Sequence, residues 1–316
     1  TRCWDRKRGE TWETETIIRL WVLKRADPET ETQPSGANAG LNTSNVSFEN
    51  TIMGYHAGNT LTGGTRNTII GTQSGTGLTN GSLNTYVGYE AGNGGSRNTA
   101  IGAFAGNSML GGAEDNTIVG YAAGNLITNG DRNTLIGTES GGSIQSGIEN
   151  TFIGYQAGRS GDRNTVVGGQ SGNLLESSAV NNTLIGFRSG SILTIGTNNT
   201  LLGAFAGNII ATGNLNTMVG FSAGRGGTRN TVIGGFAGST TTTGSSNNTV
   251  IGFSAGNTIT GGDYNTVIGF DSGKNLTSGR YNTYIGSESG GQGSFNTVIG
   301  SSAGNSLSAG AQFNTC

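Results

Sequence analysis

The chain has 316 residues, of which 60 are glycine and only two are proline, and its formal net charge is −2. Collagen is excluded because it needs glycine at every third position and abundant proline, and the near-neutral charge excludes a basic nucleic-acid-binding surface. No apolar run approaches the ~20 residues that span a membrane as a helix. We therefore expect neither nucleic acid nor a membrane span.

Residues 1–31 differ in composition from the rest of the chain. They hold all three tryptophans and several clusters of charge, and residues 11–24 contain an apolar run that fits a buried strand better than a short amphipathic helix. A flank of this length cannot bury a core of its own. We expect this Trp-rich segment to contact another subunit or to cap the following domain as a strand.

From residue 32 onwards the chain is an internal repeat. Between Asn50 and Asn116 the dipeptide Asn-Thr recurs at spacings of 17, 17, 14 and 18, and the same series of spacings returns three more times up to Asn314. A 66-residue block is thus used four times, which is typical of a solenoid. We predict an all-β fold, a parallel β-solenoid (β-roll) of about seventeen coils over residues 32–316, forming a rod about 80 Å long.

Each coil is numbered from its asparagine as place 1. Stacked asparagine amides can form a hydrogen-bonded ladder along such a solenoid. The predicted ladder begins with Asn50, Asn67, Asn84, Asn98 and Asn116.

The other places of the coil predict which side chains face inwards. Places 5 and 9 are always glycine, place 4 is always aliphatic and place 8 is always Ala or Ser. Places 4, 6 and 8 share a face in an extended strand, so we expect them to line the interior. Place 3 would then face outwards, yet it is apolar in every coil. An exposed stripe of this length predicts a buried contact between chains; it includes Ile52, Ile69, Tyr86, Ile118 and Phe152.

Coil length varies together with side-chain size. Long coils carry an apolar residue at place 12, with Thr241 as the exception, and the 14-residue coils lack this insertion. The short coils have bulky residues at place 3 instead: Tyr86, Phe152, Met218 and Tyr284. Loss of volume at one place and gain at another is what a close-packed interior demands.

Chemistry-bearing residues are scattered through the repeats. His56 is the only histidine, and the sequence contains no cluster of His, Cys or carboxylates at the spacing of a metal or catalytic site. We therefore expect no enzyme activity, no cofactor and no catalytic or metal-binding residue.

Two further features concern covalent modification. Cys3 and Cys316 are either unrelated thiols or form a disulfide between subunits in an oxidising, extracellular setting. Possible N-glycosylation sites include Asn45, Asn80, Asn181 and Asn275, although chance explains many such sequons in a chain this rich in Asn, Thr and Ser.

The repeat Asn-Thr-x-Ile-Gly-x-x-Ala-Gly, as at residues 150–158, resembles the head repeats of trimeric autotransporter adhesins and related bacterial and phage tail-fibre-like surface proteins. The resemblance covers residues 32–316. It implies a β-roll built from three chains that binds host or matrix surfaces. The spacing of the repeat here cycles through 14, 17 and 18 instead of staying near 14, and no stalk or membrane anchor is visible.

Together these features favour an extracellular or cell-surface structural or adhesive fibre protein, a rigid solenoid without a catalytic role. Its expected partners are further copies of itself, as a homotrimer or a head-to-tail filament, and host or matrix surface glycans. The alternative is an ice-binding or glycan-binding β-solenoid, because a regular threonine ladder can order water. The residues at neighbouring places of each coil are apolar instead of a second threonine, which argues against ice binding.

Overall fold

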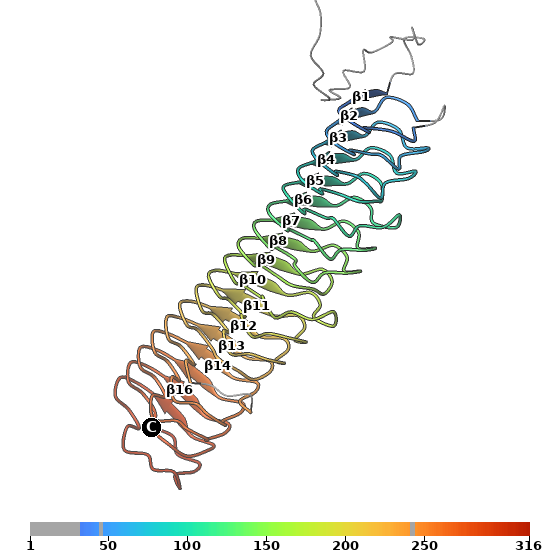
Figure 1. Ribbon diagram of the computed structural model, residues 1–316. Helices are drawn as coiled ribbons and strands as arrows, with labels where there is room; N and C mark the ends of the chain where they lie inside the picture. The colour runs from blue at the N-terminus through green and yellow to red at the C-terminus, as the bar shows by residue number, and fades with distance from the viewer. Residues whose placement is uncertain (1–31, 44–46, 241–243) are drawn as a thin grey trace, which may run out of the picture.

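The computed structural model describes residues 32–43, 47–240 and 244–316, which form one elongated rod (Figure 1). The described residues contain strands and turns and no helix. Each coil contributes one strand of three residues, and the strands lie one above another along the rod. The Trp-rich segment 1–31 falls outside the described residues.

Seventeen strands make up the sheet. Their bounds are β1 Gln33–Ser35, β2 Thr51–Met53, β3 Thr68–Ile70, β4 Thr85–Val87, β5 Thr99–Ile101, β6 Thr117–Val119, β7 Thr134–Ile136, β8 Thr151–Ile153, β9 Thr165–Val167, β10 Thr183–Ile185, β11 Thr200–Leu202, β12 Thr217–Val219, β13 Thr231–Ile233, β14 Thr249–Ile251, β15 Thr266–Ile268, β16 Thr283–Ile285 and β17 Thr297–Ile299.

Every strand pairs in parallel with the strand of the next coil, in strict register. Between β7 and β8, for example, Thr134 lies opposite Thr151 and Ile136 lies opposite Ile153. Equivalent places of successive coils therefore form straight columns along the rod. The prediction of an all-β parallel solenoid of about seventeen coils is confirmed.

Glycine at place 5 is required by the close approach of neighbouring coils. Gly137 has a φ of +126°, and a Cβ at this residue would lie 2.5 Å from the carbonyl oxygen of Gly154 in the next coil. No side chain fits at that distance, and an L-residue would also be strained at this φ. The place-5 glycine column thus sets the spacing between coils at the end of each strand.

Two further corners of each coil adopt a left-handed backbone without glycine. The residue at place 7 and the residue just before the asparagine have positive φ values, 57° in Gln73 and 59° in Arg66. Such a conformation costs about 1–2 kcal/mol for a residue with a Cβ. Both corners donate their backbone N–H to the preceding coil, Gln73 to the Tyr55 carbonyl at 2.8 Å and Arg66 to the Phe48 carbonyl at 3.0 Å. These hydrogen bonds between coils offset the strain.

The prediction of which places face the interior of the coil was wrong in part. Place 3, expected on the outside as a contact between chains, lies inside the coil in the single chain. The residues of the predicted stripe are all fully buried: Ile52, Ile69, Tyr86, Ile118 and Phe152. They pack against the small residues at place 8 and the apolar residues at place 12, such as Ala57 and Leu61. Places 4 and 6, expected inside, face outwards instead.

The error has a clear physical origin. Side chains alternate between the two faces only while the backbone stays extended, and here it stays extended for only three residues, from place 2 to place 4. The glycine corner at place 5 and the left-handed corner at place 7 turn the chain before place 8 is reached. The small buried residue at place 8 therefore shares the interior with place 3 and not with place 4.

In the short coils, one large side chain fills the interior space that place 12 fills elsewhere. The rings of Tyr86 and Phe152 extend to the place-9 glycine of their own coils, where an added Cβ would lie 2.3 Å from the ring in each case. The Tyr86 hydroxyl donates to the Gly94 carbonyl at 2.6 Å, and burial raises the pKa of this hydroxyl. The Tyr284 hydroxyl lies near the Asn296 side chain but makes no hydrogen bond.

These two tyrosines provide a matched test of packing. We expect Tyr86→Ala to destabilise the fold by about 3–5 kcal/mol, because it leaves a cavity that place 12 does not fill. Tyr86→Phe should cost about 1 kcal/mol through loss of the hydrogen bond to Gly94, whereas Tyr284→Phe should be neutral. Thermal unfolding followed by circular dichroism measures all three. Equal effects of the two Tyr→Phe changes would contradict this assignment.

Candidate functional site

The asparagines at place 1 form a continuous hydrogen-bonded ladder inside the rod. The Asn67 side-chain Nδ2 donates to Asn50 Oδ1 at 2.9 Å and to the Gly81 carbonyl of its own coil at 2.9 Å. Asn50 Oδ1 also accepts from the Asn67 backbone N–H at 2.9 Å. One amide thus closes its own coil and joins it to its neighbour. Aspartate lacks the two N–H donors that these contacts require.

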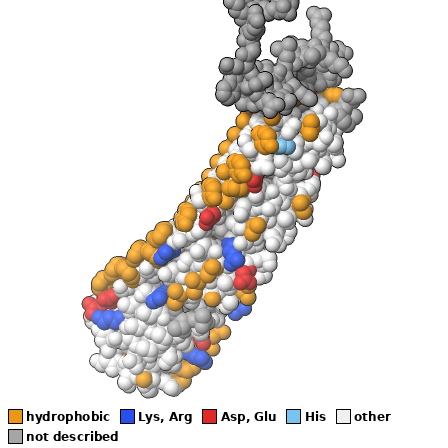
Figure 2. Space-filling model, viewed as in Figure 1, with side chains coloured by type: hydrophobic (Ala, Val, Ile, Leu, Met, Phe, Trp, Pro, Cys, Tyr) orange, Lys and Arg blue, Asp and Glu red, His pale blue; other side chains and the backbone are white. Residues whose placement is uncertain are grey.

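The outward face of the sheet carries three uncharged columns. Place 2 is threonine and place 4 is aliphatic in all sixteen coils from Asn50 to Asn296, and place 6 carries Tyr or Phe in eight of them. Many of these side chains are exposed, including Met53 at 50% and Tyr121 at 53%. A line of hydrophobic side chains runs along one edge of the rod in Figure 2.

Aromatic rings at places 6 and 7 contact one another from coil to coil. Phe187, Phe205 and Phe221 meet edge to face, with ring centroids 5.5 and 5.8 Å apart. A second column occupies the corner before the asparagine near the C-terminal end of the rod, where Tyr264 and Tyr281 stack at 4.9 Å with nearly parallel rings. Such pairs contribute about 0.5–1.5 kcal/mol each beyond the area that they bury.

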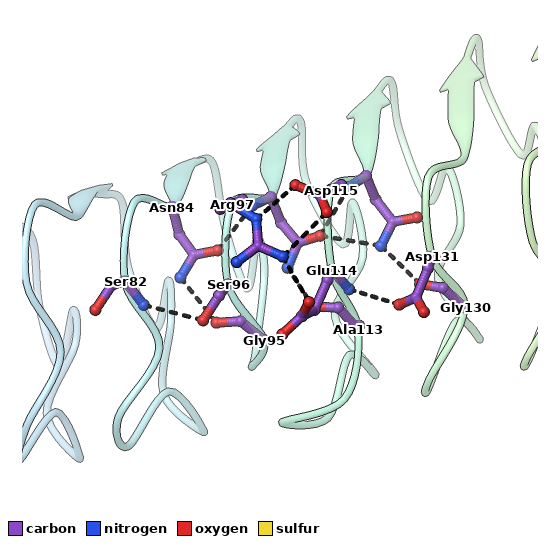
Figure 3. A network of polar contacts seen from close by, with 12 residues as sticks. Ser82, Asn84, Gly95, Ser96, Arg97, Ala113, Glu114, Asp115, Gly130 and Asp131 are labelled. Atoms are coloured by element: carbon purple, nitrogen blue, oxygen red, sulfur yellow. Dashed lines mark hydrogen bonds and ion pairs between the residues drawn. The ribbon is translucent and has the colours of Figure 1, made fainter.

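Charged residues at the corner before the asparagine link neighbouring coils (Figure 3). Arg97 donates to Asp115 Oδ1 at 2.7 Å and to Glu114 Oε2 at 2.5 Å, and the hydrogen bond from Arg97 lowers the pKa of Asp115. The Glu114 backbone N–H in turn donates to Asp131 Oδ1 at 2.9 Å. All three side chains of the Arg97 ion pairs are well exposed, and exposed pairs contribute little to stability. Their role in the fold is to bridge successive coils at the surface.

Shallow cavities occur beside the 14-residue coils. The coil that begins at Asn150 is three or four residues shorter than its neighbours, and this leaves a notch of about 440 Å³ between Ser143 of the preceding coil and Glu176 of the following one. An adjoining cavity of about 510 Å³ and a smaller one beside Glu90 and Asn93 also border short coils. Coil length therefore determines where the rod is indented.

Arg159 is the cation that the two larger cavities share. It lines both of them, donates its Nε to Ser143 Oγ at 3.1 Å, and forms no ion pair with any carboxylate of the described residues. Asn173 lines the second cavity, and its buried Oδ1 accepts no hydrogen bond. The second cavity is thus lined by a cation and by an asparagine whose buried oxygen accepts no hydrogen bond.

The remaining residues singled out from the sequence lie apart from one another. Asn80, Asn181 and Asn275 lie at or near the surface, and Asn45 falls outside the described residues. Cys316 is an exposed free thiol, and Cys3 also falls outside the described part of the chain. The disulfide between subunits and the glycosylation sites stay predictions.

No group of three or more His, Cys, Asp or Glu residues that could hold a metal occurs among the described residues. The same described ranges hold no helix that could span a membrane. Neither the models of known protein families nor the curated proteins include a match to this sequence. The structure shows a parallel β-solenoid, and no match supports the finer assignment to adhesin heads or tail-fibre-like proteins.

Two features were missed in the sequence. The outward aliphatic column was assigned to the interior, and the notches were not foreseen. A signal for the notches was present in the 14-residue interval itself, since a coil that loses three residues between two longer coils must leave a gap on its loop side.

The asparagine ladder can be tested at a single rung. In Asn150→Ala, Asn164 loses the acceptor of its backbone N–H and the Gly161 carbonyl loses its donor, both in a buried region. We expect a loss of about 2–4 kcal/mol in the free energy of unfolding, since buried groups left without partners cost about 1–3 kcal/mol each. Thermal and urea unfolding measure the effect.

The matched control is Asn80→Ala, because the Asn80 side chain is exposed and accepts a hydrogen bond from Thr62 at the surface. We expect a change within about 0.5 kcal/mol. Equal stability of the two variants would show that the ladder does not hold the coils together.

Proposed function

We propose that this chain is a rigid structural rod of an extracellular or cell-surface fibre, with an adhesive and not a catalytic role. The observation that carries this proposal is the unbroken stacking of coils. Every strand from β1 to β17 pairs with the next in register, and the asparagine ladder follows the same axis inside the rod. A shape of this kind holds two ends apart at a fixed distance.

The stacking supports rigidity because bending would break several kinds of contact at once. Each step between coils joins backbone hydrogen bonds of the strand, the left-handed corners and the asparagine amide. In solenoids each unit contacts only its neighbours, so stiffness depends on every interface being equally well made. The described coils repeat the same backbone pairing at every strand, while side chains and loop length vary from coil to coil.

The notches beside the short coils support the adhesive part of the proposal. Their linings are mainly hydroxyl, amide and charged groups, which suit the hydroxyl groups of a sugar. Arg159 in addition matches a carboxylate, since guanidinium and carboxylate form strong paired hydrogen bonds. Asp162 and Glu176 in the same lining can accept hydrogen bonds from sugar hydroxyls, and we infer that surface glycans bearing both hydroxyl and carboxylate groups are the ligands of this site.

Electron microscopy of the purified full chain tests the structural role. We expect straight rods about 80 Å long for the solenoid, with a spacing of about 4.8 Å between coils along the axis. Cryo-electron microscopy of native material should show the same rods within a fibre. Compact globular particles would contradict the proposal.

A glycan array tests the adhesive role. We expect retention of carboxylated oligosaccharides and about tenfold weaker binding in Arg159→Gln, because a charged hydrogen bond is lost. The control is Arg163→Gln, since Arg163 donates to Asn181 and lies outside the residues that line the two larger cavities. Binding that is unaffected by Arg159→Gln would place adhesion elsewhere. Release of cleaved sugar would contradict the non-catalytic assignment.

A further inference from the structure

The strongest unassigned feature is the outward face of the sheet, here called the outer band. It consists of places 2, 4 and 6 in the sixteen coils from Asn50 to Asn296. Place 4 holds sixteen aliphatic residues and place 6 holds eight aromatic ones. Within the band, Ile153 and Tyr155 or Ile185 and Phe187 lie on either side of the corner glycine, and all four side chains are exposed.

β-sheet propensity alone does not explain the aliphatic column. Thr151 at place 2 and Ile153 at place 4 stand on the same strand and face the same side, and both residue types favour strands. Place 2 is nevertheless threonine in every one of the sixteen coils, whereas place 4 is never threonine. A second requirement must therefore act at place 4, and removal of apolar side chains from water is the simplest one.

The distribution of charge around the band resembles the anatomy of a protein interface. The band itself contains no charged residue in any of the sixteen coils. Charges begin at the flanking columns, with Glu90 and Arg188 at place 7 on one side and Arg97 and Arg132 just before the asparagine on the other. An uncharged apolar centre with a polar rim is typical of surfaces that another protein covers.

The area of the band is sufficient for a stable complex. Eight place-4 side chains are exposed by 36–60%, and the others are half-buried. Together the sixteen side chains present on the order of 1,000 Å² of apolar surface, and a stable interface buries about 800 Å² on each partner. Monomeric soluble proteins seldom leave a contiguous patch of this size uncovered.

We propose that a second copy of this chain covers the outer band, so that two rods pack face to face through their sheets. The partner must present matching side chains about every 4.8 Å over sixteen layers. A second copy of this chain has the same spacing between its coils because it has the same fold. One such face per chain gives a closed two-fold contact in which the same residues meet on both sides. The two sheets would then lie about 10 Å apart, as in other packed sheets.

This proposal rests on the structural role proposed above. It can be wrong while the role of the chain as a rigid rod remains correct. Sedimentation equilibrium of the full chain in reducing buffer tests it, because reduction prevents a disulfide through Cys3 or Cys316 from producing a dimer. We expect the mass of two 32.0 kDa chains. The variant Ile136→Lys/Ile153→Lys/Ile185→Lys should dimerise at least about a hundredfold more weakly, since like charges would meet across the contact.

A matched control uses exposed apolar residues on the loop side of the rod. Leu174, Ile192 and Ile209 are exposed by 39%, 37% and 36%, close to the 36–40% of the three band residues. Leu174→Lys/Ile192→Lys/Ile209→Lys should dimerise like the wild type. Circular dichroism and electron microscopy of both variants confirm that the rods are intact.

Three results would overturn the proposal. The wild-type chain could sediment as a monomer at a chain concentration of tens of micromolar. Even a weak dimer, with a dissociation constant on the order of micromolar, would be populated at that concentration. The band variant could dimerise as tightly as the loop-side control. A monomer that shows thermal hysteresis, abolished by the three band substitutions alone, would assign the threonine and aliphatic columns to ice instead. In each case rods seen by microscopy would leave the proposed structural role standing.

Discussion

The whole molecule depends on the hydrogen bonds between one coil and the next. A coil this short encloses only a thin core, so a single coil buries too little apolar surface to offset the entropy of ordering it. Stacking changes this balance because each added coil gains a strand interface, two corner hydrogen bonds and an amide rung. Glu149 and Gln156, residues with no preference for left-handed backbone, are held in that conformation by carbonyls of the preceding coil. Local strain is thus tolerated wherever the neighbouring coil supplies an acceptor.

The repeat in the sequence determined the architecture, because every coil must present the same groups to the next. The intervals between asparagines predicted the number of coils, and the amide column indicated the ladder that Asn67 and Asn50 form. The direction of the apolar side chains could not be derived in the same way. Whether Ile52 or Met53 points inwards depends on how the chain turns at Gly54 and His56, and these corners are formed by contacts with other coils that local sequence does not encode.

The candidate site shows the same limit in another form. The sequence showed that titratable and metal-ligating residues are spread along the chain. It did not predict the proximity of Arg159 and Asn173, because these residues belong to successive coils. Their proximity follows from the short coil at Asn150, which lowers the loop side of the rod between two longer coils. Volume compensation by Phe152 keeps the interior full while the exterior is indented. The shortening of this one coil therefore determines both the packing of its interior and the indentation of its surface.

That change of length recurs once in every 66-residue block, about every 19 Å along the axis, and the cavities described above border the short coils that begin at Asn84 and Asn150. The residue equivalent to Arg159 is again arginine in Arg225 but is Asn93 or Gly291 in the other two short coils, so the side chains at this place differ from block to block. A polymer with a similar repeat distance would meet the indentations at Asn84 and Asn150 at once. Weak contacts at single indentations would then combine into strong avidity, without any one of them being tight.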